Sequence, residues 1–492
     1  MKSYDTLAAV DMGSNSFRLE VVRVAGDQLY PLDSLKETVR LAGGLGEDKN
    51  LDEATQEGAL ACLQRFGERL RGLSPEAIRC VGTSALRVAK NANAFIRKAE
   101  DALGHPIEIV AGREEARLIY LGVAHSLPAS PDRRLVVDIG GGSTEFIIGH
   151  GLKPHERESL HMGCVNFSQR FFTGGVIDKS ALKAAEVAAR AEVERIAREF
   201  SRKNWQQAIG SSGTARALRE ILEQNGWSEL GITADGLAKL RTHFIKAGQI
   251  ESLELAGLAR DRRPVIAGGF AIMAGLFAEL GIEQMDVAET AMREGILYDL
   301  LGRFHEQDMR EETVAEFMRR YHIDSQQAAR IGQAALKLLA AAGGGNENDK
   351  RFLDWAARLH EIGLSVSHSG YHRHSGYILE NADMPGFSRS DQARLALLTR
   401  AQRGALIKLP EFAADGALVD SDRLLVWLFR QAVILCRSRS GPHLPDVKVD
   451  ASSKRFRLTL PEGWLENHPM TQRALEEESV HWHAVGIRYL FA

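Results

Sequence analysis

Short apolar runs alternate with longer segments of helical spacing over roughly the first 300 residues of the chain. Residues 6–11, 17–24 and 28–35 are strand-like runs separated by a few turn residues, which predicts three antiparallel strands. Segment 53–72 instead places its apolar residues on one helical face, and residues 78–81 return to a short buried strand.

The same alternation continues along the chain. Residues 107–110 predict a strand that leads into a helix from about residue 114. Residues 135–138 and 145–148 predict a second pair of strands, and residues 181–200 predict a long helix. Alternating strands and helices predict an α/β fold.

The pattern changes near residue 303, where strand-like runs give way to helical spacing. Segments 313–320, 325–342 and 351–364 are predicted helices, followed by more helix up to residue 437, and the glycine-rich stretch 343–349 is a predicted flexible loop. Gly441-Pro-His-Leu-Pro interrupts this region. Three strand-like runs at 447–449, 455–460 and 481–491 then predict a small α/β tail.

One strand–turn–strand unit occurs twice. LAAVDMGSNSFRLEVV, which begins at Leu7, aligns with LVVDIGGGSTEFII, which begins at Leu135. Each copy contains an apolar strand, an aspartate, an apolar residue, a glycine, a small polar turn and a second apolar strand. A repeated unit of this kind predicts two related domains that face each other across a cleft.

Three glycine-containing loops follow predicted strands and have the chemistry of phosphate binding. The first follows Asp11, the second follows Asp138 and adds Glu145, and the third, IGSSGT from Ile209, opens a helix whose amides would point at an anion. Glycine lets the backbone approach a phosphate, and a carboxylate at the end of a buried strand can hold Mg²⁺, usually through water. None is a Walker loop or a dinucleotide loop. Turn geometry alone would explain any one of them, but the three together predict a phosphate site.

Composition narrows the possible classes of protein. A chain of 492 residues is too long to fold around one hydrophobic core, so three or four domains are expected. The net charge of −3 gives no global attraction for a polyanion, so positive charge would have to gather locally. The cysteines form no Cys-x-x-Cys pair, and neither a disulfide framework nor a zinc site is expected from Cys62, Cys80, Cys164 and Cys436.

The N-terminus lacks the apolar stretch of a signal peptide, and the longest apolar run, 265–278, is too short to span a bilayer. We therefore expect a cytoplasmic protein with no transmembrane segment. Peripheral association with a membrane is left open.

The first 300 residues contain the segments AAVDMGSNSFRLEVV, VGTSALRVAKNA, REEARLIYLGVAHS, VVDIGGGSTEFIIG and GSSGTARAL. These segments resemble the exopolyphosphatase / guanosine pentaphosphate phosphohydrolase (Ppx/GppA) family, within the actin, Hsp70 and sugar-kinase superfamily. Downstream, YHIDSQQA and LHEIGLSVSHSGYHRHSGYILENADMPGF resemble the C-terminal half of the long, four-domain exopolyphosphatases.

This resemblance implies two actin-like (ASKHA, ribonuclease H-like) domains around a cleft, an all-helical HD-like domain and a small C-terminal α/β domain. The implied boundaries are 1–120, 121–303, 304–440 and 441–492.

The resemblance also places a catalytic glutamate in the REEARLIY segment. On a helix, Glu115 shares a face with Leu118 and Ile119, whereas Glu114 is adjacent to Arg117 and is expected to be solvated. A carboxylate on an apolar face suits a general base for water. The alternative is that both glutamates only start a helix, where the dipole favours acidic residues. The helical face on which Glu115 lies and its position in the family segment both favour this residue, which is the predicted base.

The other roles follow from the resemblance and from phosphoryl transfer, in which the protein mainly neutralises and aligns charge. Asp138 and Glu145 are expected to hold Mg²⁺ with support from Asp11. A monovalent cation such as K⁺ is left open as a second cofactor. Arg87 matches a family arginine at the cleft mouth and suits bidentate phosphate contact, with a surface arginine as an equal alternative. The residues expected to hold phosphate oxygens are Ser14, Asn15, Ser16, Gly140, Gly141, Gly142, Ser143, Thr144, Ser212, Gly213 and Thr214.

Two segments depart from the patterns that they resemble. HD-type metal phosphohydrolases need a His-Asp pair, and this chain has His360 followed by Glu361. We expect a degenerate helical domain without its own metal, and His368, His372, His374 and Arg373 are candidates for contact with polyphosphate. The segment IAGGFA from Ile266 resembles the adenosine loop of actin-like ATPases, although close helix packing explains its glycines better.

The leading function is processive hydrolysis of the terminal phosphate of inorganic polyphosphate, which releases orthophosphate. Hydrolysis of guanosine pentaphosphate (pppGpp) to the tetraphosphate is the alternative within the family. An actin-like ATPase or kinase is less favoured, because such kinases use an aspartate base. A non-catalytic binder is disfavoured by the intact set of Glu115, Asp138 and Glu145. We expect a homodimer and no nucleic-acid partner.

Overall fold

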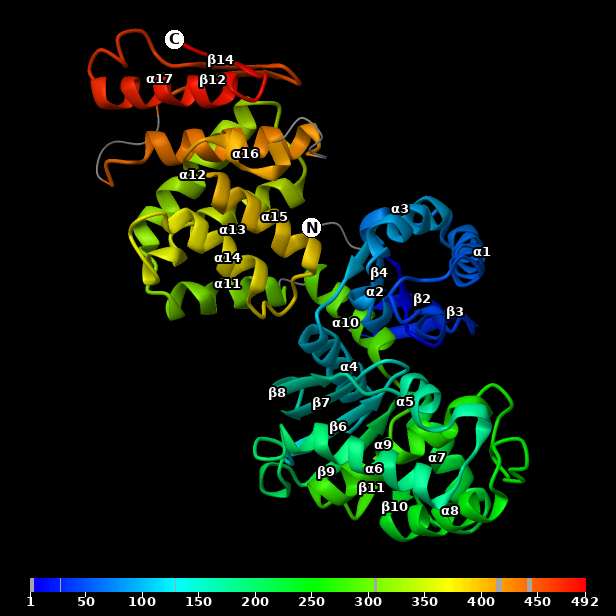
Figure 1. The fold of residues 1–492 in the computed structure, drawn as a ribbon. Helices are drawn as coiled ribbons and strands as arrows, with labels where there is room; N and C mark the ends of the chain where they lie inside the picture. The colour runs from blue at the N-terminus through cyan, green and yellow to red at the C-terminus, as the bar shows by residue number, and fades with distance from the viewer. Residues whose placement is uncertain (1–3, 27, 129, 305–307, 413–417, 440–444) are drawn as a thin grey trace. The chain divides into compact units, whose positions relative to one another are not determined.

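The computed structural model describes residues 4–26, 28–128, 130–304, 308–412, 418–439 and 445–492 (Figure 1). The chain divides into two compact units, Met1–Met309 and Arg310–Ala492. The division into four domains stays a prediction.

The first sheet of the N-terminal unit has the strand order β3-β2-β1-β4-β5. Its first three strands run antiparallel, as the sequence predicts, and β1, β4 and β5 run parallel to one another. The strands are β1 Thr6–Met12, β2 Phe17–Ala25, β3 Gln28–Glu37, β4 Ile78–Gly82 and β5 Ile107–Ile109.

Both faces of this sheet are covered by helices, because its central strands are apolar on both sides. Ala8 and Val10 of β1 pack into one core with the apolar stripes of α1 and α3. Leu7 and Ala9 point the other way, into a core shared with α4 and α10. The helices are α1 Glu53–Leu70, α2 Ser84–Val88, α3 Ala92–Leu103, α4 Gly112–Ser126 and α10 Met292–Phe304.

The second sheet repeats the arrangement of the first and has the order β10-β11-β9-β6-β7-β8. Strands β6, β7 and β8 are antiparallel, and β9 and β11 continue the sheet in parallel from β6. The two Asp-containing loops lie at equivalent turns, between β1 and β2 and between β6 and β7, so the internal repeat is confirmed. The strands are β6 Arg134–Ile139, β7 Thr144–His150, β8 Lys153–Leu160, β9 Gln207–Ser211, β10 Ile232–Thr233 and β11 Gln284–Val287.

Five helices accompany the second sheet and share its large core. One of them, α6, ends at Glu194 rather than near residue 200 as predicted. The helices are α5 Cys164–Phe171, α6 Lys179–Glu194, α7 Ser212–Gln224, α8 Ala234–Ala247 and α9 Ile266–Leu280.

Helix α9 is apolar around most of its circumference. The stretch Arg263–Leu280 has 18 residues and, by length and composition, could cross a membrane, contrary to the expectation that this run is too short. However, 72% of it is buried inside the N-terminal unit. Gly268 faces the backbone of α5, where a Cβ would lie 2.6 Å from the Cys164 carbonyl oxygen. The glycines of this segment therefore allow close helix packing.

Helices α4 and α10 pack backbone against backbone. A Cβ on Gly122 would collide with the Ala291 carbonyl oxygen, and a Cβ on Gly295 would collide with that of Leu118. Only glycine fits at these two positions, which brings the start of α10 beside the helix that carries Glu115.

The expectation that Glu114 is solvated is wrong. Glu114 is buried, and both of its oxygens accept hydrogen bonds from Arg117 at 2.8 Å. Arg117 also donates a hydrogen bond to Asp299 of α10. Asp299 Oδ2 in turn accepts a hydrogen bond from Arg79 Nη1 of β4 at 2.6 Å. Three neighbouring arginines outweigh burial and hold the pKa of Asp299 below its usual value. This ion-pair network ties α4 to α10 and to the first sheet.

The C-terminal unit is built around helices, with a three-stranded sheet of order β12-β13-β14 at its end. One core joins the helices to this sheet, where Trp427 stacks on Phe456 with ring centroids 4.9 Å apart. The elements are α11 Met309–Arg320, α12 Ser325–Ala341, α13 Glu347–Leu359, α14 Tyr371–Asn381, α15 Arg389–Ala401, α16 Asp420–Leu435, β12 Lys448–Ser452, β13 Arg455–Thr459, α17 Pro469–His483 and β14 Arg488–Phe491.

Several boundaries in this unit differ from the prediction: α11 begins at Met309 rather than residue 313, and α13 ends at Leu359 rather than residue 364. The glycine loop ends early because Asn346 caps α13, accepting the Asp349 N–H at 2.8 Å. Residues 481–483 belong to α17, so the last strand covers only Arg488–Phe491. The first four residues of the predicted interruption at 441–445 lie outside the described residues.

Candidate active site

A cavity of about 130 Å³ lies between the two sheets of the N-terminal unit. The β1–β2 and β6–β7 turns meet at this cleft, because a Cβ on Gly141 would lie only 3.0 Å from the Ser14 Cβ. The sequence repeat therefore brings its two loops together. Of the sequence-predicted residues, the cleft is lined by Asp11, Ser14, Asn15, Ser16, Glu115, Asp138, Gly140, Gly141, Ser143, Ser212 and Gly213.

The start of α5 fixes the second loop. The Cys164 and Val165 N–H groups donate to the carbonyl oxygens of Gly140 and Gly141 at 2.9 and 3.0 Å. Asn166 adds a side-chain bond to the Gly142 carbonyl oxygen at 3.1 Å. These bonds stabilise the conformation of the loop within the protein itself.

The third loop joins β9 to α7 through an unusual backbone conformation. Ser212 has a φ of 82°, in the left-handed region that costs a non-glycine residue about 1–3 kcal/mol. Its Oγ donates to the Ile139 carbonyl oxygen at 3.0 Å and accepts the Thr214 N–H at 3.2 Å. These bonds hold the N-terminus of α7 at the cleft, where helical N–H groups favour an anion.

Three buried or half-buried carboxylates lie together at the ends of the strands. Asp138 is the cross-strand partner of Glu145, and Asp11 occupies the equivalent position in the first sheet. Ser159 Oγ donates to Glu145 Oε1 at 2.8 Å. Glu145 itself is 1% exposed and lies behind the lining of the cleft.

Nearby positive charges do not offset the cost of burying these carboxylates in their ionised form. Burial raises the pKa of Asp11 to about 7 and that of Asp138 to about 6. Burial, together with the charges of Glu115 and Asp138, raises the pKa of Glu145 well above its usual value. A cation beside them would offset this cost, so the residues fit a hard metal ion such as Mg²⁺.

No group of three His, Cys, Asp or Glu side chains within the described parts of the chain has the geometry to hold a metal. A Mg²⁺ ion here would therefore take several of its ligands from water and substrate, as is usual for this ion.

Glu115 lies in the first turns of α4 and is 7% exposed. Its Oε2 accepts a hydrogen bond from Arg87 Nη1 at 2.6 Å. The same nitrogen donates to the Val110 carbonyl oxygen at 2.9 Å, which fixes the guanidinium. Arg87 therefore orients the glutamate and does not itself line the cleft.

The structure also keeps three other predicted residues away from the cleft surface. The Thr144 hydroxyl donates to the Met162 carbonyl oxygen at 2.6 Å, and that of Thr214 donates to the Ile139 carbonyl oxygen at 3.0 Å. Gly142 lies against Ser84, with a would-be Cβ 3.0 Å from its Oγ. These residues shape the loops from behind.

The cleft is also lined by four arginines that were not predicted from the sequence. They are Arg18, Arg216, Arg262 and Arg293. Burial, followed by the charge of Arg293, lowers the pKa of Arg18 below its usual value. An anion bound between these arginines would relieve the repulsion of their like charges.

Each of these arginines comes from a different element. Arg18 is the cross-strand partner of Asp11, and Arg216 follows the third loop and donates to the Glu289 carbonyl oxygen at 2.6 Å. Arg262 lies on Gly213, where a Cβ would collide with its guanidinium. Arg293 pairs with Glu20 and Glu294. Proximity to the loop motifs could have revealed the first two, but nothing local marks the last two.

Comparison with known proteins identifies the family of this chain. Residues 20–304 match the model of the Ppx/GppA phosphatase family, and residues 309–479 match that of the Ppx/GppA phosphatase domain III. The Ppx/GppA family member from Aquifex aeolicus has 26% identity and a TM-score of 0.52, covering 61% of this chain and 98% of its own. An exopolyphosphatase from Cytophaga hutchinsonii has 24% identity and a TM-score of 0.55, with the same coverage, and supports the fold. The two family models span most of the sequence, and the chain therefore belongs to the Ppx/GppA phosphatase family of hydrolases acting on phosphoanhydride bonds.

Proposed function

We propose that this hydrolase removes the terminal phosphate of inorganic polyphosphate, with Mg²⁺ as its cofactor. The observation that carries the proposal is the lining of the cleft, which has four arginines and, among the described residues, no aromatic side chain. A chain of phosphates offers negative charge along its whole length, which four arginines can engage. A guanine base would instead gain from stacking on an aromatic ring.

The terminal phosphate would lie among the three loops, at the N-terminus of α7. Glu115 would take a proton from a water molecule, whose oxygen attacks the terminal phosphorus as the bond to the bridging oxygen breaks. Arg87 would act as a positioning residue that holds Glu115 toward the cleft. The products are orthophosphate and a chain that is one phosphate shorter.

Asp11 and Asp138 would hold Mg²⁺ from the side of the strands, largely through water, with Glu145 behind them. When bound, the ion neutralises charge on the transferred phosphoryl group and on the bridging oxygen. The carboxylates must ionise to accept it, which their raised pKa values oppose at low pH.

Turnover of purified protein on long polyphosphate and on guanosine pentaphosphate tests the proposal. We expect a higher kcat/KM for polyphosphate, and the Glu115→Gln variant controls for contaminating phosphatases. A clear preference for guanosine pentaphosphate would overturn the proposal in favour of the nucleotide activity.

Product lengths separate two modes of action on long chains. If action is processive, a gel should show long chains disappearing while no intermediate lengths accumulate. A ladder of intermediates would show distributive action instead.

A further inference from the structure

A row of side chains leads from the cleft to the outer edge of the first sheet. Asp11 of β1 lies opposite Arg18 of β2, and Arg18 lies opposite Lys36 of β3. Directly opposite residues of antiparallel strands share one face of the sheet. Asp11 and Arg18 line the cavity, so Lys36 extends the same row outward by one strand spacing, about 4.8 Å.

The residues on either side of Lys36 agree with this direction. Leu35 packs against the core that includes the apolar stripe of α1, on the opposite face of the sheet. Glu37 accepts a hydrogen bond from Arg65 of α1 at 2.8 Å. Because side chains alternate along a strand, Lys36 points to the face that carries Asp11.

Lys36 is paired with a residue from the half of the unit that contains the second sheet. Its Nζ donates to Asp261 Oδ2 at 3.1 Å. Asp261 immediately precedes Arg262, which lines the cavity and lies on Gly213 of the third loop. The ion pair of Lys36 and Asp261 therefore joins the two sides of the cleft just outside the cavity lining.

This ion pair is open to exchange with a ligand. The side chains of Lys36 and Asp261 are 39% and 40% exposed. An ion pair in such contact with water contributes little to stability, because solvent screens the attraction between its charges. A phosphate oxygen can therefore replace the Asp261 carboxylate at Lys36 at little cost.

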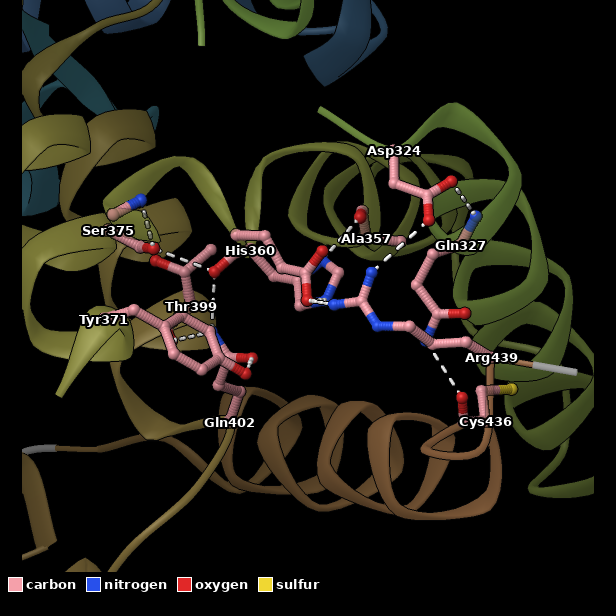
Figure 2. Close-up of polar contacts among 12 residues, drawn as sticks. Asp324, Gln327, Ala357, His360, Tyr371, Ser375, Thr399, Gln402, Cys436 and Arg439 are labelled. Carbon is pink, nitrogen blue, oxygen red and sulfur yellow. Dashed lines mark hydrogen bonds and ion pairs between the residues drawn. The ribbon is translucent and has the colours of Figure 1, made fainter. Parts of the chain in front are cut away.

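A polar cluster in the C-terminal unit shows the opposite arrangement (Figure 2). There the His360 carbonyl oxygen accepts hydrogen bonds from Ser375 Oγ and Gln402 Nε2, both at 2.8 Å. The side chains of all three residues are buried. Buried bonds of this kind hold the fold together, whereas the pair of Lys36 and Asp261 leaves both partners accessible to a ligand.

We propose that Lys36 binds a phosphate of the substrate beyond the terminal one, and that Asp261 occupies Lys36 until a chain long enough to reach it displaces the carboxylate. The inference rests on the proposed function, because it takes the terminal phosphate to lie among the three loops. A linear polyphosphate carries negative charge at every phosphate, so one chain can bind the loops and Lys36 together. A short chain ends before Lys36 and leaves the ion pair intact. Lys36 thus selects for long chains, and Asp261 weakens that selection by competing for Lys36.

Binding measured in a chelator, where Mg²⁺ is absent and turnover does not occur, tests this inference. Long polyphosphate and pyrophosphate are titrated into wild type, Lys36→Met, Lys36→Arg, Asp261→Asn and the control Lys239→Met, which breaks an exposed ion pair with Asp235 on α8. The Kd of long polyphosphate should rise about 2–5-fold in Lys36→Met and fall by a similar factor in Asp261→Asn, the usual effect of one partly exposed charge contact. Lys36→Arg keeps the charge, so it and Lys239→Met should bind long chains as wild type does. The Kd of pyrophosphate should be the same in every variant.

Salt dependence separates a direct contact from a structural effect. Lys36→Met should make the slope of log Kd against log salt concentration shallower by about 0.7–0.9, because one fewer counterion is released. If the pair only ties the two sides of the cleft together, Lys36→Met and Asp261→Asn will shift Kd in the same direction, which would overturn the inference. An unchanged Kd for long chains in both variants would overturn it as well, and Asp261→Asn alone decides if Lys36→Met does not fold.

The proposed function fails separately from this inference. Wild type that binds long polyphosphate but does not hydrolyse it when Mg²⁺ is added would refute the hydrolysis and leave the roles of Lys36 and Asp261 standing. Wild type that hydrolyses long polyphosphate, with both variants matching its Kd, would refute those roles alone.

Discussion

Replacing Glu115 with glutamine removes one negative charge from the cleft with almost no change in shape. Glu115 is 7% exposed and accepts Arg87 Nη1 at 2.6 Å, a bond that the amide oxygen of glutamine can keep. A positioned general base contributes about 10²–10⁴-fold to the rate, or about 3–5 kcal/mol of the barrier. We therefore expect kcat for polyphosphate to fall by about 10²–10⁴ while KM changes little.

The adjacent Glu114 offers a matched control, because the same substitution there should affect stability and not chemistry. Glu114 pairs with the buried Arg117, so Glu114→Gln weakens the compensation of a buried cation, a change that costs up to about 3–5 kcal/mol. Single-turnover phosphate release at a temperature where both variants are folded measures the chemistry, and circular dichroism melting measures stability.

We expect Glu115→Gln to lower the rate of phosphate release and Glu114→Gln to lower the melting temperature. Near-normal kcat in Glu115→Gln would show that this glutamate is not the base. Equal loss of kcat in both variants would show that the position of α4, rather than proton transfer, explains the effect.

Three further changes test other parts of the site. Asp138→Asn and Glu145→Gln should each raise the Mg²⁺ concentration for half activity, because each removes an anionic oxygen, and an unchanged titration in both would exclude the metal role. Gly213→Ala should push Arg262 out of the cleft and lower kcat/KM about 10–100-fold, the worth of one charge-assisted contact, whereas Gly58→Ala in α1, where a Cβ meets nothing within 4 Å, should leave activity intact. In metal-free protein, the pKa of Asp138, raised from 3.8 to about 6, makes ionisation of this carboxyl destabilising, so stability should be lost as pH rises through this window. Melting temperatures in a chelator should show this loss in wild type relative to Asp138→Asn, and parallel pH profiles would contradict it.

Local sequence patterns predicted much of the fold and the loops of the site. The Asp-Gly turns follow strands whose apolar pattern is strong, so the cleft could be placed from Asp11 and Asp138 alone. The repeat of one unit predicted that the two loops face each other, and the close approach of Gly141 to Ser14 confirms it.

Features that depend on distant partners could not be predicted in the same way. Glu114 is buried because Arg117 has a partner, Asp299, that lies 182 residues further along the chain. Arg262 reaches the cleft only because Gly213 leaves room for it. The sequence predicts that the hydroxyls of Thr144 and Thr214 bind phosphate. In the structure both hydroxyls instead donate hydrogen bonds to backbone carbonyl oxygens.

The four arginines of the cleft repel one another when no anion lies between them, and any small oxyanion relieves that repulsion. Orthophosphate and sulfate should therefore compete with the substrate and raise the melting temperature of the free protein. The departing phosphate also leaves a site whose charge attracts it. Orthophosphate that stays bound blocks the next substrate, so assays in phosphate or sulfate buffers will understate the activity.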